Sequence, residues 1–410
     1  MENRYYLKCI NCGKVHKTDR IACTCGGILT PVYNIEYAKG VIPDKLSRAE
    51  LGLKRFSPVL PVNPRPASQG EGDTPLVKST KLGKIMNLKN LYFKNETLNP
   101  TGSFKDRSLA VMTAHAKERG YQSILLASTG NAGISLASYG KRCGMNTVVL
   151  VSEKTPQEKW RIITDLGATV IRVRNIFEGP HRELIELLNE VSSGLNAYNA
   201  FCWALANPIS TEGVKTISYE IAYQFRGDVP DFIVTPVGGG DNLFGLWKGF
   251  VELAEIGIVD RIPRLIGVQS KNACPLVISY EKGLDHVVPV QNPDSIASGI
   301  NVAFTGDHAL MAIRKSMGTA VSVPDPAIIE GKRELMKHEG LMVETTSGCV
   351  IPAIKKLSDA GIIDPSDHIV CVLTGSGIKE ISKNKLQYEP VIIEKNPNKI
   401  VQTINLMKGG

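Results

Sequence analysis

The sequence lacks three features that would place a protein at a membrane, outside the cell or on nucleic acid. No apolar run approaches the roughly 18 to 20 residues that cross a bilayer. The N-terminal residues, MENRYYLK, do not have the pattern of a signal peptide. The net charge of +8 is spread along the chain and forms no basic block. We therefore expect a cytoplasmic protein that has no membrane partner and no nucleic-acid partner.

The length and the hydrophobic pattern are typical of a globular α/β protein. The 410 residues, of which 43% are hydrophobic, can bury a large core and should divide into two or three units. Short apolar runs, such as 124–127, 147–151 and 169–173, alternate with amphipathic stretches. This alternation predicts parallel strands that are connected by helices.

The most informative stretch is residues 99–107, NPTGSFKDR. Pro100 and Gly102 mark a turn, and an apolar helical pattern begins directly after it. We expect Ser103 to be the N-cap, which places Lys105 near the positive end of the helix dipole. The charged amine is disfavoured there, and a neutral amine can attack a carbonyl, so Lys105 is a candidate Schiff-base lysine. The alternative is a surface turn without chemistry.

Three more turns follow apolar, strand-like runs: residues 128–133 (STGNAG), 236–242 (PVGGGDN) and 374–377 (TGSG). Open α/β sheets bind their ligands at such turns. Three consecutive glycines leave the backbone N–H groups unobstructed, so the second turn can bind a phosphate ahead of a helix. A flexible turn is the alternative for these glycines, and an N-cap is the alternative for Asn131.

Together with residues 71–76 (EGDTPL), these motifs resemble those of the threonine synthase family, which are pyridoxal-phosphate enzymes of fold type II, similar to tryptophan synthase β. The resemblance runs from about residue 70 to about residue 380. It implies two open parallel-sheet lobes with the cofactor between them, a small-molecule amino-acid substrate and a homodimer. It also implies that Lys105 binds pyridoxal 5'-phosphate covalently and that other residues complete the cofactor site: Asn131, Gly238, Gly239, Gly240, Asp241, Asn242 and Thr374.

The resemblance gives some of these residues particular roles. Asn131 would contact the ring hydroxyl, and Thr374 would contact the pyridine nitrogen. Because a neutral hydroxyl does not hold a proton on that nitrogen, Thr374 favours elimination or replacement over transamination. Ser128 and Thr129 would bind the α-carboxylate of the substrate. Glu344 falls where the family often has a glutamate near the ring, and the alternative for it is an acid at a helix start.

One segment departs from the family pattern. Threonine synthases bind the phosphate of O-phosphohomoserine with a motif N-S-x-N-P-x-R, which aligns here with residues 204–210, ALANPIS. Ala204, Leu205 and Ser210 replace the three side chains that would bind phosphate. An apolar leucine cannot solvate a dianion, and the loss of the arginine removes a bidentate partner.

We therefore predict elimination or replacement at Cβ or Cγ of an amino acid other than O-phosphohomoserine. One alternative is a genuine threonine synthase that holds phosphate through other residues, such as Lys215. The other alternative is a non-catalytic homologue that binds pyridoxal phosphate.

Four of the nine cysteines lie near the N-terminus as two pairs, Cys9 with Cys12 and Cys23 with Cys25. Two such pairs can supply four thiolates to one structural zinc ion. A ribbon without metal and a redox pair are the alternatives. We expect the other cysteines to be small core residues: Cys143, Cys202, Cys274, Cys349 and Cys371.

We expect five segments along the chain. They are a cysteine-rich, zinc-ribbon-like segment (1–32), a linker that leads into the large lobe (33–102), a smaller mobile lobe with Lys105 (103–203), a large lobe with the glycine-rich turn (204–385) and a C-terminal tail (386–410).

Overall fold

The computed structural model describes residues 5–383, except residues 19, 47–50, 129 and 156. Contacts divide the chain into two units, Met1–Gly377 and Ile378–Gly410, and the description below concerns the first of them. The predicted tail, 386–410, lies outside the described residues. The segment boundaries expected at residues 32, 102, 203 and 385 stay predictions.

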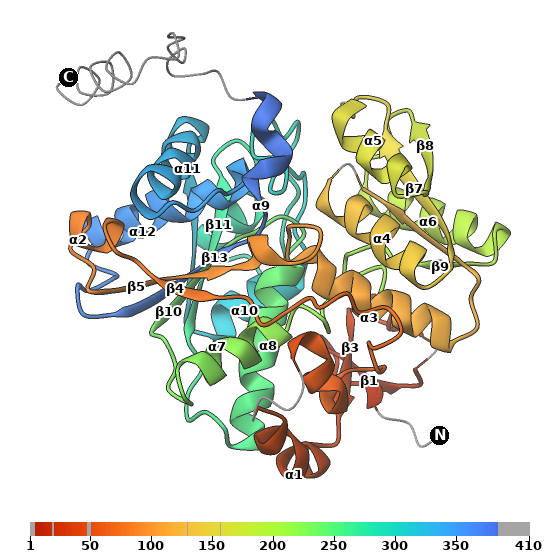
Figure 1. Cartoon of the computed structure of the whole chain (residues 1–410), viewed down its shortest axis with the longest axis horizontal. Helices are drawn as coiled ribbons and strands as arrows, with labels where there is room; N and C mark the ends of the chain where they lie inside the picture. The colour runs from red at the N-terminus through yellow and green to blue at the C-terminus, as the bar shows by residue number, and fades with distance from the viewer. Residues whose placement is uncertain (1–4, 19, 47–50, 129, 156, 384–410) are drawn as a thin grey trace, which may run out of the picture. The chain divides into compact units, whose positions relative to one another are not determined.

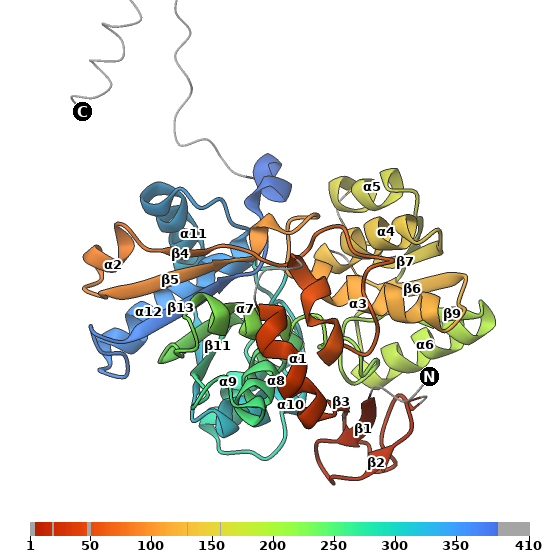
Figure 2. The ribbon, with the colours of Figure 1, turned by 60° about the horizontal axis from the view of Figure 1, so that its bottom comes forward.

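The N-terminal part folds as a three-stranded antiparallel sheet in the order β2-β1-β3 (Figure 2). Its strands are β1 (Tyr5–Cys9), β2 (Val15–His16) and β3 (Leu29–Tyr33). Alternate residues of β1 are buried, as period-two patterning requires when one face of a sheet is covered. Two helices follow, α1 (Ile35–Leu46) and η1 (Gly52–Val59).

A six-stranded sheet forms the larger lobe, in the order β12-β11-β10-β13-β5-β4, with β4 alone antiparallel to its neighbour. Its strands are β4 (Leu76–Lys78), β5 (Asn90–Asn95), β10 (Phe232–Pro236), β11 (Arg264–Ser270), β12 (Thr319–Val323) and β13 (His368–Leu373). The elements that accompany it are α2 (Leu82–Ile85), η2 (Glu96–Leu98), α7 (Thr216–Gln224), α8 (Asp241–Ile256), α9 (Pro275–Glu281), α10 (Asp307–Lys315), α11 (Asp325–Glu339), η3 (Thr345–Cys349) and α12 (Val350–Asp359), and η4 (Gly377–Lys383) begins where the first unit ends.

Both faces of this sheet are buried, which explains why its central strands β10 and β13 are mostly apolar. Ile233 and Val370 belong to the core that contains residues of α7, α8 and α10. Their neighbours Phe232 and Ile369 point the other way, into the core that contains residues of α11 and α12. Figure 1 shows these two groups of helices on opposite sides of the sheet.

The smaller lobe is a parallel sheet in the order β8-β7-β6-β9 (Figure 1, orange to yellow-green). Its strands are β6 (Ser123–Ala127), β7 (Asn146–Ser152), β8 (Thr169–Val173) and β9 (Ala197–Asn199), and its helices are α3 (Lys105–Glu118), α4 (Asn131–Arg142), α5 (Gln157–Asp165) and α6 (His181–Gly194). The predicted strands at 124–127, 147–151 and 169–173 agree with β6, β7 and β8 to within one residue at each end. The α/β fold with two parallel-sheet lobes is thus confirmed. None of the described helices is both long and apolar enough to cross a bilayer.

A buried ion network connects α3 to the larger lobe. The Arg107 guanidinium donates to both carboxylate oxygens of Glu96, at 2.7 and 2.8 Å, and to both of Glu220, at 2.6 and 2.8 Å. Lys94 Nζ lies 2.7 Å from Glu220, and none of these side chains is exposed to solvent. Burial alone would raise the pKa of Glu220, but the Arg107 and Lys94 charges hold that pKa below its usual value. The network therefore fixes α3, with Lys105 at its first position, against β5 and α7.

We expect Arg107→Met to lower the free energy of unfolding by about 3–5 kcal/mol, because it removes the guanidinium that pairs with the buried carboxylates of Glu96 and Glu220 and leaves only Lys94 as a nearby cation. Arg161→Met is the control, since Arg161 faces Asp165 at 3.8 Å with both side chains 70% exposed. The control should change stability by less than about 1 kcal/mol. Denaturant unfolding measures both values, and equal losses in the two variants would contradict the role of the network.

Candidate functional site

Helix α3 begins at Lys105, and its N-cap is Phe104. The prediction that Ser103 is the N-cap is therefore wrong. The buried hydroxyl of Ser103 has no hydrogen-bond partner among the described residues, so it does not cap the first turn. Instead, the Asp106 carboxylate accepts hydrogen bonds from the main-chain N–H of Thr101, at 2.6 Å, and from its hydroxyl, at 2.5 Å. These bonds close the turn that presents Lys105.

The Lys105 turn lies beside the turn that follows β13. Phe104 N–H donates to the carbonyl of Thr374 at 3.0 Å, and Ser376 N–H donates to the carbonyl of Gly102 at 2.8 Å. Ser103 and Gly375 form an antiparallel bridge between these two contacts. The structure thus brings together two of the four predicted motifs, one from each lobe.

Glu344, which precedes η3, joins two predicted cofactor residues. Its carboxylate accepts a hydrogen bond from Asn131 Nδ2 at 2.8 Å and one from Thr374 Oγ1 at 3.3 Å. Asn131 opens α4 and Thr374 follows β13, so this single carboxylate connects the two lobes. A side chain at Gly375 would collide with Glu344. The structure fits both interpretations of Glu344, which stands at the start of η3 and whose carboxylate lies beside the predicted ring contacts.

The glycine-rich turn between β10 and α8 presents a row of free amide donors. The carbonyl of Gly238 accepts from Thr305 Oγ1 at 2.8 Å, and that of Gly239 accepts from Gly306 N–H at 3.0 Å. Within the described residues, no hydrogen bond uses the N–H groups of Gly238, Gly239 and Gly240. A fixed loop with unpaired N–H groups at the N-terminus of a 16-residue helix suits an anion. The turn therefore fits the phosphate of pyridoxal phosphate.

Gly240 gives a test of this turn, because its φ of +107° favours glycine and an added Cβ would stand 2.8 Å from Ala309 Cβ. We expect Gly240→Ala to weaken cofactor binding about tenfold or more, since the strain of roughly 1–3 kcal/mol moves the loop. Gly257→Ala, at the other end of α8, is the control: its φ is +84°, but an added Cβ meets nothing within 4 Å. Cofactor affinity, measured by equilibrium dialysis, should be unchanged in the control. Equal affinity in both variants would remove this loop from the cofactor site.

The residues predicted to bind the substrate lie in two places. Ser128 follows β6, and its hydroxyl accepts a hydrogen bond from Gly130 N–H at 3.2 Å. Thr129 lies outside the described residues. Ala204 and Ser210 belong to the segment between β9 and α7, and both are buried. Leu205 lies between them in the same segment.

The side chain of Asp241 contacts the segment 204–210. Its Oδ1 accepts a hydrogen bond from Ala204 N–H at 2.7 Å and one from Ser210 Oγ at 3.1 Å. We had predicted Asp241 as a cofactor contact in the glycine-rich turn, and that role stays a prediction for its main chain. The contact of its carboxylate with residues 204 and 210 was missed. The sequence did contain a signal for it: a carboxylate is unfavourable beside a bound anion, so an aspartate at the end of an anion-binding turn should point to other donors.

Cys202 lies two residues before Ala204, at the corner where Asp241 meets Ala204 and Ser210. It differs from the other four cysteines outside the N-terminal cluster. Burial raises the pKa of its thiol to about 11, while the charge of Lys105 lowers it and that of Asp241 raises it further. Cys202 is therefore close enough to both charges to respond to them. It is half-buried, whereas the remaining four that we predicted as core residues are fully buried: Cys143, Cys274, Cys349 and Cys371.

Lys215 is not available for a substrate phosphate. Its ammonium lies 2.8 Å from Glu212 and 2.8 Å from Glu252, and its side chain is not exposed. Lys248 pairs with Glu212 as well and donates to the carbonyl of Pro31 in β3. The EGVKT motif at residues 212–216 thus contributes two charges of a buried cluster that attaches the N-terminal sheet to α7 and α8.

The four N-terminal cysteines converge. Their Sγ atoms all lie within 4.8 Å of one another, and three of the distances are 3.5 to 3.6 Å. A tetrahedral zinc site with Zn–S bonds of about 2.3 Å has sulfur–sulfur edges of roughly 3.8 Å. The cluster therefore fits a zinc ion, and zinc stays a prediction. The ligands that we predict for it are Cys9, Cys12, Cys23 and Cys25.

We expect metal analysis of the purified protein to give about one zinc per chain. Cys25→Ser should lower this content, because a closed four-cysteine site needs every thiolate. Cys274→Ser should not, since Cys274 lies outside the cluster. Less than about half an equivalent of zinc, with four reactive thiols, would contradict a metal site.

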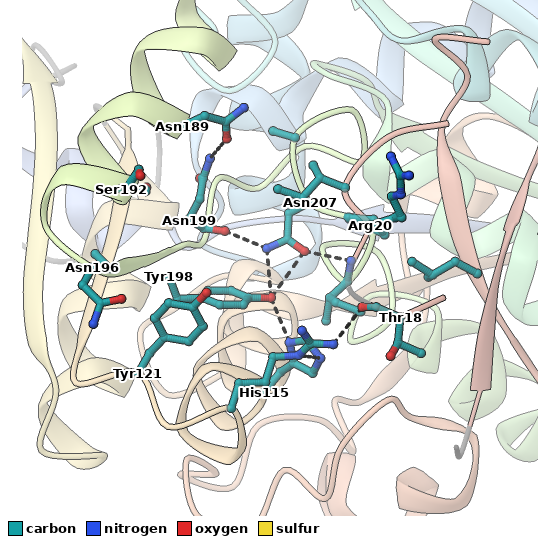
Figure 3. A pocket seen from close by; sticks show the side chains of 18 residues that line it. Thr18, Arg20, His115, Tyr121, Asn189, Ser192, Asn196, Tyr198, Asn199 and Asn207 are labelled. Atoms are coloured by element: carbon teal, nitrogen blue, oxygen red, sulfur yellow. Dashed lines mark hydrogen bonds between the residues drawn. The ribbon is translucent and has the colours of Figure 1, made fainter. Parts of the chain in front are cut away.

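A separate cavity of about 520 Å³ lies between the N-terminal sheet, α3, α6 and β9 (Figure 3). It is lined by both polar and apolar side chains and includes none of the predicted cofactor residues. His115 Nδ1 lies 3.0 Å from Tyr198 Oη, to which Asn207 Nδ2 donates at 3.1 Å. Burial, with Arg119 nearby, lowers the pKa of His115 to about 3, so this ring is uncharged at neutral pH. The hydrogen bonds connect α3 to the segment that carries Ser210.

Two parallel-sheet lobes, a lysine at the start of α3 and a glycine-rich phosphate turn define the pyridoxal-phosphate enzymes of fold type II. The family model described as "Pyridoxal-phosphate dependent enzyme" matches residues 67–375. The threonine synthase of Methanocaldococcus jannaschii is 38% identical over 408 residues, which are 95% of this chain and 97% of that protein. The threonine synthase of Methanosarcina acetivorans is 34% identical over 415 residues, with 98% of each chain covered. The chain therefore belongs to the threonine synthase family of pyridoxal-phosphate-dependent enzymes.

Solved structures agree on the fold. Threonine deaminase isoform 2 from Solanum lycopersicum superposes with a TM-score of 0.62 at 21% identity and covers 82% of this chain and 84% of its own. Maize serine racemase has a TM-score of 0.62 at 20% identity, with 82% and 92% covered.

Proposed function

We propose that this threonine synthase-like enzyme catalyses elimination or replacement at Cβ or Cγ of an amino acid whose side chain is not phosphorylated. The observation that carries the proposal is the hydrogen bonding of Ser210 and Ala204 to Asp241. In the family motif the equivalents of Ala204, Leu205 and Ser210 bind the phosphate of O-phosphohomoserine. Here the donors at both ends of that segment are already bound to a carboxylate of the protein itself.

Electrostatics also disfavours a phosphate at this corner. Asp241 is 5% exposed, and a substrate phosphate beside this buried carboxylate, with only Ala204, Leu205 and Ser210 around it, would be repelled in a medium of low polarity. The cofactor phosphate would differ, because the free N–H groups of Gly238 to Gly240 and the N-terminus of α8 compensate its charge. Leu205 offers no hydrogen bond, and Lys215 is held by Glu212 and Glu252. Residues that could neutralise a dianion are therefore lacking among the described side chains of this segment.

Each of the remaining site residues would contact a different part of the cofactor. When it is bound, pyridoxal phosphate supplies the electron sink that stabilises negative charge at the α-carbon of the substrate. Lys105 Nζ would hold its aldehyde carbon, and the N–H groups of Gly238 to Gly240 would hold its phosphate. Glu344 orients Asn131 and Thr374 through the hydrogen bonds described above. The neutral Thr374 hydroxyl leaves the ring nitrogen without a counter-charge, which favours elimination or replacement.

A genuine threonine synthase is the second candidate, and the identity to two archaeal threonine synthases supports it. In that case phosphate would be bound by residues other than Lys215 and the 204–210 segment. A non-catalytic homologue is a weaker candidate, because Lys105 is present and the donors of the glycine-rich turn are free. A homodimer in the cytoplasm remains the assembly and the location that we propose.

The test compares substrates with the purified holoenzyme. We expect kcat/KM for O-phospho-L-homoserine to lie several orders of magnitude below that for the preferred unphosphorylated amino acid, because three polar contacts to the phosphate are missing. The comparison uses L-homoserine and its acetyl and succinyl esters. Borohydride reduction should attach the cofactor to the peptide that contains Lys105, and Lys105→Ala should abolish turnover.

A wild-type enzyme that makes threonine from O-phosphohomoserine at ordinary rates, of order 1–100 per second, would favour the second candidate. The reverse variant, Ser210→Arg with Ala204→Asn and Leu205→Ser, should gain activity with O-phosphohomoserine. An adduct on a lysine other than Lys105 would overturn the cofactor assignment.

A further inference from the structure

We infer that Asp241 forms a subsite for a hydrogen-bond donor at the end of the substrate side chain, and that an ammonium group is its preferred ligand. This inference rests on the proposed function, since it concerns the same site. It adds the chemical class of the substrate, which is an amino acid with a cationic or hydrogen-bond-donating side-chain terminus. The observations that carry it concern the two carboxylate oxygens of Asp241 and the charges around them.

One oxygen of Asp241 is occupied and the other is not. Oδ1 accepts both hydrogen bonds, from Ala204 N–H and Ser210 Oγ. Among the described residues, none donates a hydrogen bond to Oδ2. Oδ2 lies 3.5 Å from the place where a Cβ of Gly239 would stand, so it faces the glycine-rich turn. The free oxygen is thus beside the predicted cofactor site.

The carboxylate has no protein cation as a partner within the described part of the chain. The nearest titratable nitrogen is Nε2 of His308, 3.9 Å from Oδ1, and His308 is fully buried. Burial lowers the pKa of His308, so that its ring is uncharged at neutral pH. Neither ring nitrogen of His308 has a hydrogen-bond partner among the described residues. Asp241 is therefore held by neutral donors and by the α8 dipole, without an opposite full charge.

A buried carboxylate in this condition favours a cationic ligand. Burial of a charge is costly unless it is paired, and a charge-assisted hydrogen bond is roughly twice as strong as a neutral one. Lys105, whose charge reaches Cys202 beside this corner, is committed to the cofactor under the proposed function. The remaining source of positive charge is the substrate. Ser210 and Ala204 would hold Oδ1 in place while Oδ2 binds the incoming donor.

The test uses four amino acids that differ mainly in the terminal group on Cγ. They are L-2,4-diaminobutyrate with an ammonium group, L-homoserine with a hydroxyl, L-norvaline with a methyl and O-phospho-L-homoserine with a phosphate. Binding to the wild-type holoenzyme is followed through the absorbance of the bound cofactor. We expect the affinities to decrease in the order ammonium, hydroxyl, methyl, phosphate.

The isosteric variant Asp241→Asn removes the charge and keeps the shape. We expect it to lose about tenfold or more in affinity for L-2,4-diaminobutyrate, to change little with L-norvaline and to gain with O-phospho-L-homoserine. Asp325→Asn is the control, because Asp325 also opens a helix and accepts hydrogen bonds from two serine hydroxyls and one main-chain N–H. The control should keep the wild-type order of affinities. Cofactor affinity and thermal unfolding of both variants show whether the fold and the loop are intact.

The two proposals fail in different ways. If the enzyme turns over an unphosphorylated amino acid but binds L-norvaline as tightly as L-2,4-diaminobutyrate, the subsite is wrong and the proposed function stands. An Asp241→Asn variant with the wild-type order of affinities also overturns the subsite. If O-phospho-L-homoserine is the best ligand and the best substrate, the proposed function is wrong as well. Should Asp241→Asn not retain the cofactor, the order measured with the wild-type enzyme decides.

Discussion

The position of Lys105, the lysine that we propose binds the cofactor, depends on the buried ion network around Arg107. The guanidinium lies two residues beyond Lys105 and binds all four oxygens of Glu96 and Glu220, with no solvent access. Such a network does not by itself add much stability, because its charges have lost their hydration. It does penalise any movement of α3, since a shift would leave buried charges unpaired. The start of α3 is therefore held at one place relative to β5 and α7.

Around this fixed point, the cofactor half of the site is assembled from both lobes. Main-chain hydrogen bonds attach the Lys105 turn to the turn after β13, and Glu344 joins Asn131 to Thr374. The glycine-rich turn is held through its carbonyls, so its N–H groups stay available for an anion. Donors that are held in place before the ligand arrives lower the ordering cost of binding. The geometry is thus preorganised for one cofactor.

The substrate half uses the same framework with different chemistry. Segment 212–216 contributes Glu212 and Lys215 to a buried cluster that packs against the N-terminal sheet. In the preceding segment, Ala204, Leu205 and Ser210 stand where we expect the family motif to place side chains that bind an anion. Asp241, from the far end of the glycine-rich turn, now occupies the donors that remain. Under our proposal, a framework that is shared with threonine synthases therefore favours a donor or cationic group, and not a phosphate, beside Asp241.

The sequence by itself determined the local elements: the turn ahead of Lys105, the apolar strands β6, β7 and β8, and the glycine-rich turn before α8. These depend on residues that are close in the chain, through φ preferences and hydrophobic periodicity. Only the tertiary structure decided that the Ser103 hydroxyl leaves the first turn of α3 uncapped, that Glu344 meets Asn131 and Thr374, and that the Asp241 side chain turns toward residues 204 and 210. Local sequence patterns do not predict these contacts, because the residues that meet are far apart in the chain. The direction of each side chain is set by the packing around it.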